Sequence, residues 1–159
     1  MANTQAMCTS FKKELLLATH AFGDGTGVPA HTSGVADAFM AALFLTTGTL
    51  GAGTTSYTSV TGSEVSGTGY TPGGVAVTFG AANNPSSSGT TAFTTPTASI
   101  VFTGVTLATA FDTVLLYNNT LAGKNAVSVH TFTAQTITAG TLTLTMPTNA
   151  AGTALLQIS

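Results

Sequence analysis

The sequence predicts a mainly β protein: an antiparallel β-sandwich or barrel of jelly-roll-like form, with one α-helix near the N-terminus. About a fifth of the chain is threonine, a β-branched residue that favours pleated, half-buried surfaces. From residue 38 onward, short apolar segments alternate with turns rich in Gly, Pro, Asn and Ser. A parallel α/β fold is disfavoured, because only one segment has the helical pattern that crossovers between parallel strands need.

The helix is expected over residues 8–22, CTSFKKELLLATHAF. Four apolar residues recur there at steps of four, three and four, which places them in one stripe along a helix. They are Phe11, Leu15, Ala18 and Phe22. Such a stripe suits a contact with another protein molecule, and it suits equally well a place in the core of its own domain.

Eight segments are expected to be strands with turns between them. They are residues 38–46, 54–60, 74–79, 98–103, 112–118, 126–133, 141–146 and 154–158. The clearest is 141–146, TLTLTM, in which Leu142, Leu144 and Met146 face one side and the threonines face the other. Residues 83–91, NNPSSSGTT, have the composition of an exposed loop.

The length of the chain, 159 residues, suits one structural unit with a continuous apolar core. We expect a helical segment and loop over residues 1–34 and the β-sandwich or barrel over 35–159, with both packed together. No stretch has the pattern of a signal peptide or of a transmembrane span, so we expect no membrane association.

Charge is scarce: 5% of residues are charged, whereas about 25% are charged in an ordinary soluble domain. The cations are Lys12, Lys13 and Lys124, and the net charge is −2. This is too little positive charge to neutralise several phosphates, so direct binding of nucleic acid is not expected. A neutral surface of hydroxyls and small side chains offers little repulsion between copies, which favours self-association.

The glycine-dense run 64–74, EVSGTGYTPGG, spaces three glycines as GxGxxxG. A strand pattern follows it, and no helix is available to direct backbone N–H groups at a phosphate. We interpret the run as a turn. The three histidines, His20, His31 and His130, are widely spaced and have no cluster of Cys or carboxylates around them, so no metal site is expected.

Enzymatic residues are not evident either. There is no GxSxG motif, and Asp24, Asp37, Glu64 and Asp112 are isolated in the sequence. Cys8 lies near the N-terminus, a poor position for a nucleophile. The sequence therefore predicts a protein that is not an enzyme and that needs no cofactor.

Four stretches of the chain resemble a group of small virion proteins from tailed bacteriophages. They are TSFKKELLLATHAF (9–22), the long stretch 37–74, TVLLYNNTLAGKNAVSVHTF (113–132) and TITAGTLTLTMP (136–147). The resemblance implies a capsid decoration or cement protein that bridges and stabilises capsid subunits. It implies a homo-oligomer, expected to be a trimer, that is bound to the major capsid protein or other virion proteins. Its location would be the virion, after assembly in the cytoplasm of the host bacterium.

In this setting the stripe Phe11, Leu15, Ala18 and Phe22 is the expected contact with the capsid or with another subunit. Two other functions stay open. The first is a tail, connector or fibre-base subunit of the virion, which would likewise be β-rich and lack catalytic residues. The second is a glycan-binding module, in which Tyr57, Tyr70 or Tyr117 would stack on sugars.

Overall fold

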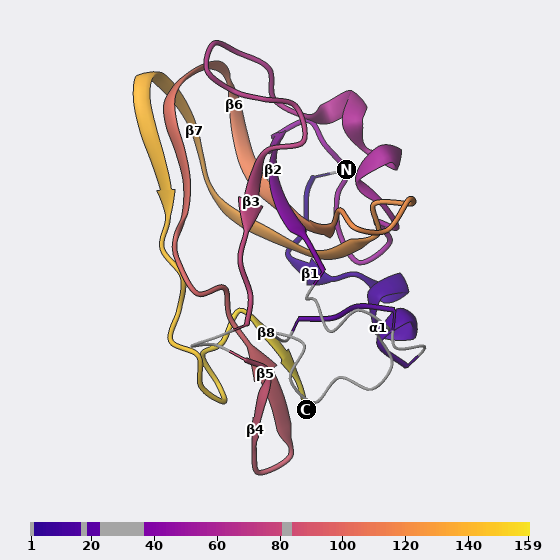
Figure 1. Cartoon of the computed structure of the whole chain (residues 1–159). Helices are drawn as coiled ribbons and strands as arrows, with labels where there is room; N and C mark the ends of the chain where they lie inside the picture. The colour runs from indigo at the N-terminus through magenta and orange to yellow at the C-terminus, as the bar shows by residue number, and fades with distance from the viewer. Residues whose placement is uncertain (1, 17–18, 23–36, 81–83) are drawn as a thin grey trace.

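The computed structural model describes residues 2–16, 19–22, 37–80 and 84–159 (Figure 1). Over these residues the protein is mainly β, with two antiparallel sheets and a single short helix, α1 (Thr9–Leu16). This confirms the predicted fold class, and the arrangement is sandwich-like. No pairing among the described residues closes the larger sheet into a barrel.

The larger sheet has five strands in the order β1-β7-β6-β2-β3. Their bounds are β1 (Ala6–Met7), β7 (Ala126–Leu144), β6 (Ile100–Asn118), β2 (Phe39–Leu45) and β3 (Val75–Val77). The strands β6 and β7 form a hairpin in which each strand has 19 residues. The smaller sheet, β4-β5-β8, consists of β4 (Ser86–Ser88), β5 (Thr91–Thr94) and β8 (Leu156–Ile158).

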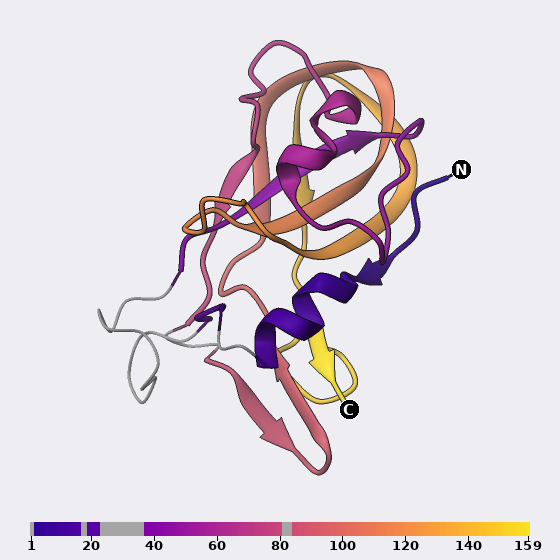
Figure 2. The ribbon, with the colours of Figure 1, turned by 90° about the vertical axis from the view of Figure 1, so that its right-hand side faces the viewer.

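The long hairpin bends strongly, and in Figure 2 β6 and β7 arch round the core while β2 crosses inside the arch. The register between the two strands shifts at several points, and each shift inserts extra residues on one strand. Gly104 in β6 and Ala139 in β7 both have positive φ, 65° and 46°. The bulges therefore let two strands cover a curved core that flat strands would leave open.

The core contains side chains from all parts of the larger sheet. In β2, four consecutive residues, Ala41, Ala42, Leu43 and Phe44, are fully buried, so this strand is covered on both of its faces. The end of β6 next to it is also continuously buried. In contrast, the first part of β6 and the last part of β7 alternate between buried and exposed residues, as expected where one face meets water.

Two predicted elements differ from the structure. The helix was expected over residues 8–22, but α1 ends at Leu16, and the backbone N–H of Thr19 donates to the carbonyl of Glu14. The predicted strand 54–60 is wrong, because the chain there forms 3-10 helices, η1 (Tyr57–Ser59) and then η2 (Thr61–Ser63). The hydroxyl of Ser56 accepts from the N–H of Ser59 and caps the first of these turns.

Other predicted boundaries also change. The expected strands 98–103 and 112–118 are parts of the continuous strand β6, and 126–133 and 141–146 belong largely to β7. Because of the bulges, each strand continues through residues that were expected to separate two strands. The loop predicted over 83–91 includes the strand β4, one of the two outer strands of the smaller sheet.

The glycine-dense run 64–74 is a turn, as predicted, and its glycines allow close backbone contacts. A Cβ on Gly67 would lie 2.0 Å from the carbonyl oxygen of Thr106, and one on Gly74 would lie 1.8 Å from that of Ala41. Gly74 also has a φ of 78°, which side chains disfavour. The run therefore packs against β6 and β2, and the backbone N–H groups of Val65, Tyr70 and Gly74 donate to carbonyls of the chain itself.

Candidate functional site

An apolar groove of about 490 Å³ lies between α1 and the smaller sheet. Its lining comes from β1, α1, the residues after α1, β5 and β8, and includes Met7, Phe11, Leu15, Phe93, Leu156 and Ile158. Figure 2 shows α1 beside the small sheet, with the C-terminal strand β8 nearby. Ile158 is 49% exposed, one of two large apolar side chains that are strongly exposed in the described part of the chain. The groove is therefore a concave surface lined mostly by apolar side chains.

The groove brings together three of the four residues of the predicted contact stripe. Phe11 and Phe22 are 2% and 7% exposed and belong to the core. Leu15 is half-buried at the groove. Ala18 lies outside the described residues. Phe11 and Phe22 thus pack in the core of their own chain. Leu15 is the member of the stripe whose side chain is partly accessible to another molecule.

Aromatic rings form the floor of the groove and continue into the core. The Phe22 ring stacks on Phe39 with centroids 4.4 Å apart and meets Phe11 and Phe79 edge-on at 5.8 and 4.9 Å. The ring of His20 lies 4.9 Å from that of Phe11. Such contacts stabilise these rings in their packed positions beneath the groove.

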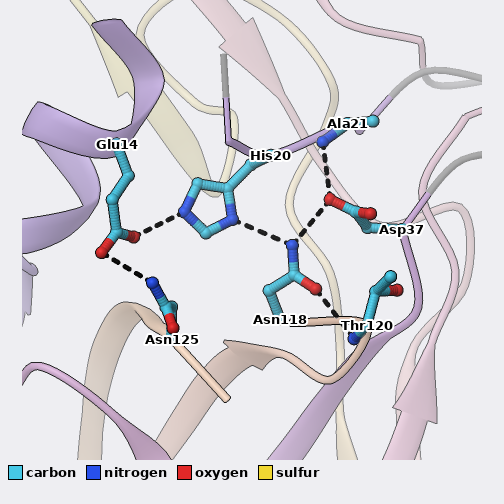
Figure 3. A network of polar contacts seen from close by, with 7 residues as sticks. All are labelled: Glu14, His20, Ala21, Asp37, Asn118, Thr120 and Asn125. Atoms are coloured by element: carbon cyan, nitrogen blue, oxygen red, sulfur yellow. Dashed lines mark hydrogen bonds and ion pairs between the residues drawn. The ribbon is translucent and has the colours of Figure 1, made fainter. Parts of the chain in front are cut away.

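A buried polar network lies next to this aromatic floor (Figure 3). His20 Nε2 lies 2.7 Å from Glu14 Oε2, and the side chain of His20 has no exposed surface. Asn125 Nδ2 donates to the other oxygen of Glu14 at 2.8 Å, and Asn118 Nδ2 lies 3.0 Å from His20 Nδ1. The network connects α1 and the residues after it to the two strand ends at the turn of the β6–β7 hairpin.

The hydrogen bonds of Asn118 determine the tautomer of His20. The backbone N–H of Thr120 donates to Asn118 Oδ1 at 3.0 Å, which orients the amide so that Nδ2 faces both Asp37 Oδ2, at 2.7 Å, and His20. Nδ2 therefore donates to His20 Nδ1, and the proton of the neutral ring is on Nε2, where it donates to Glu14. Asp37 also accepts from the N–H of Ala21 at 2.8 Å.

A second network is centred on Glu64, at the start of the glycine-dense run. The hydroxyls of Tyr57 and Tyr70 donate to its carboxylate at 2.6 and 2.8 Å, and the N–H of Gly73 donates at 2.7 Å. The hydroxyl of Tyr117 donates to the carbonyl of Gly73 at 2.9 Å, and its ring stacks on Tyr57 with centroids 4.7 Å apart. These hydrogen bonds thus hold the glycine-dense run, with Tyr70 in it, against Tyr57 and Tyr117.

The three tyrosines are therefore not available to stack on sugars. Tyr57, Tyr70 and Tyr117 are all buried, and their hydroxyls are used in these internal hydrogen bonds. Burial raises the pKa of Tyr117 to about 12. This overturns the expectation that one of them forms a glycan-binding platform.

The remaining reactive groups are also buried or isolated. Cys8 is fully buried, and burial with the nearby charge of Glu14 raises its thiol pKa to about 12. His130 is half-buried beside Ser128, with Nε2 2.9 Å from Oγ, and burial lowers its pKa to about 4. His31 lies outside the described residues. Among the residues that the structure describes, no group of three or more His, Cys, Asp or Glu could hold a metal ion.

No pattern in the sequence predicts these networks. His20 and Asn118 are 98 residues apart, and no motif links them. Comparison with protein-family models, with curated proteins and with solved structures finds no match to this chain. In the described part of the chain, no helix is both long and apolar enough to cross a membrane.

Proposed function

We propose that this chain is a structural protein of a tailed-phage virion, a capsid decoration or cement protein that binds the outside of the shell and stabilises joints between capsid subunits. The mechanism is mechanical. A folded cap that bridges neighbouring subunits adds buried area across the joint, and several attached copies raise the effective affinity of weak single contacts. The resemblance of the sequence to small phage virion proteins motivates this proposal.

The observation that carries the proposal is the use of the carboxylates. Glu14, Asp37, Glu64 and Asp112 each accept hydrogen bonds from groups of their own chain, and three of them join segments far apart in sequence. The fifth acid, Asp24, lies outside the described residues. Acids that catalyse reactions face a cavity that substrate can enter, whereas these acids hold the fold together. This use of the few carboxylates favours a structural protein over an enzyme.

The apolar groove supplies the proposed contact with the shell. Leu15 and Ile158 offer partly exposed apolar surface on its two sides, and aromatic side chains lie beneath them. An apolar concave surface in a chain with few charges suits a protruding apolar side chain or loop of a capsid subunit. This assigns the capsid contact to Leu15 and the groove, with Phe11 and Phe22 beneath it.

Co-sedimentation tests the proposal. Shells of the phage that encodes this chain, assembled without it, are mixed with the purified protein and pelleted. We expect the wild-type protein to pellet with shells and Ile158→Glu to lose at least about tenfold in affinity, because a carboxylate would be buried against apolar surface. Thr109→Glu, at an exposed site in β6, is the matched control and should bind as wild type does.

Copy number separates the cement role from the tail, connector or fibre-base alternative. A cement protein is present in many copies around the shell, and a tail or connector subunit in few. Densitometry of stained gels of whole virions measures this ratio against the major capsid protein. A few copies per virion, with no binding to shells, would replace the capsid role by the tail alternative.

A further inference from the structure

Over the last part of β7, one edge of the larger sheet has no partner strand in the described part of the chain. On the side away from β6, β7 pairs with β1 only at Ser128 and Val129, and none of the described residues pairs with β7 beyond them. In an antiparallel sheet an unpaired edge presents backbone N–H and C=O groups that another strand can bind.

The usual protection of such an edge is missing between residues 140 and 146. Natural edges are blocked by charged residues, prolines, bulges or very short strands. The stretch GTLTLTM has no charge and no proline, and the bulge at Ala139 and Pro147 lie just outside it. Thr141, Thr143 and Thr145 are exposed, so a neighbouring strand would meet small hydroxyl side chains on that face.

The sequence of this edge is symmetric. Residues 141–145, TLTLT, read the same in both directions about Thr143. In an antiparallel pair centred there, Thr143 faces the Thr143 of the second copy, and Leu142 faces Leu144 of the second copy. Threonines then meet on one face and leucines on the other, which keeps the apolar face of each strand continuous with its own core.

The other outer strands in the described part of the chain are shorter than the unpaired edge of β7. β1, β3, β4 and β8 have two or three residues each. The first part of β6 also has no strand partner on the side away from β7, but Gly104 there has positive φ and Thr68 of the glycine-dense run bridges Thr106. Val101, 40% exposed, lies opposite Thr143 in the β6–β7 ladder and therefore beside the seam that such a pair would form.

We propose that two copies of this chain associate by antiparallel pairing of residues 141–145, the end of β7 and the residue after it, about a two-fold axis at Thr143. The pairing continues the sheet from β6 and β7 of one copy into β7 and β6 of the other. It is isologous, so it closes at two copies. This is a different symmetry from the trimer that the resemblance implies.

Cross-linking tests the axis directly. Opposed residues in an antiparallel pair have Cα atoms about 4.5 to 5.5 Å apart, a separation that a disulfide spans. With oxidised glutathione as the oxidant, Thr143→Cys should form covalent dimers, whereas Thr103→Cys, an exposed site one strand away from the edge, should not. Cys8 is buried and present in both variants. Equal dimer yields from the two variants would overturn the proposal.

Charge substitution gives a second, reversible test by light scattering at increasing protein concentration. The wild type should be dimeric, and Thr143→Lys or Thr143→Glu should each weaken the dimer at least about tenfold, since like charges would meet at the axis. Mixing the two variants should restore a dimer. Thr103→Lys should leave dimerisation unchanged. A wild type that stays monomeric or forms trimers, or a Thr143→Lys dimer of wild-type affinity, would overturn the pairing.

The β7 pairing goes beyond the proposed function, and it rests on the edge of β7 and not on the groove. The two can fail separately. If Thr143→Lys loses the dimer but still binds shells, the result supports both the β7 pairing and the contact of the groove with the shell. A monomeric wild type that still pellets with shells would remove the β7 pairing alone.

Discussion

Asn118 Nδ2 lies 3.0 Å from His20 Nδ1, and through this contact the residues after α1 are held on the end of β6. Replacing His20 by Phe keeps a ring among the neighbouring aromatics but removes the hydrogen bonds to Asn118 and Glu14. We expect the free energy of unfolding in urea to fall by about 1 to 3 kcal/mol, since buried polar groups lose their partner. Thr109→Ala, at an exposed site, should stay within about 0.5 kcal/mol of wild type. Unchanged stability of His20→Phe would contradict a structural role for the network.

The glycine-dense run should tolerate no side chain at its last residue. In Gly74→Ala the new Cβ overlaps the carbonyl of Ala41 and the residue also has positive φ, so we expect a loss of at least about 3 kcal/mol. Gly89 also has positive φ, but nothing lies near its Cβ position, so Gly89→Ala should lose only about 1 kcal/mol. Thermal or urea unfolding of both variants measures the difference. Equal losses would show that backbone contact at Gly74 is not what requires glycine.

The thiol of Cys8 should be unreactive in the folded protein. It is fully buried and its pKa is raised to about 12, so almost no thiolate is present at pH 8. In Thr103→Cys, which adds an exposed thiol, we expect one rapid and one slow reaction with a disulfide reagent. The slow reaction should become rapid in urea. Two rapid reactions in the folded protein would contradict the position of Cys8.

His130 should make stability depend on pH. Burial lowers its pKa from 6.5 to about 4, so the unfolded state binds more protons than the folded state between these values. Stability from the neutral ring is complete above pH 6.5 and is lost as the pH falls towards 4, by up to about 3 kcal/mol. The check is urea unfolding at pH 7.5 and 4.5. His130→Gln, which can keep the hydrogen bond to Ser128, should lose less stability over this range; an equal loss would assign the effect to other groups.

The sequence predicts the fold class because its strands alternate clearly. The stretch TLTLTM shows the two faces of β7 directly, and the apolar residues 39–45 predict the buried strand β2. Strand continuity was harder to predict, because Gly104 reads as a break although a bulge carries β6 through it. Residues 54–60 are rich in β-branched and aromatic residues, yet local side-chain capping by Ser56 favours 3-10 turns.

The candidate site was predicted in part. The helical spacing places Phe11 and Leu15 on one face of α1, and both line the groove, but its opposite wall includes Leu156 and Ile158 from the last strand. Only the fold brings these segments together. The networks around His20 and Glu64 depend in the same way on long-range contacts, for which single-sequence patterns carry no information.

We propose that this chain binds the outside of a capsid shell through the apolar groove. Cryo-electron microscopy of shells assembled without the protein and then incubated with it tests this most directly. We predict ordered density on the shell exterior, with Leu15 and Ile158 facing a capsid subunit. Shells that remain bare at saturating concentrations of folded protein would contradict the claim.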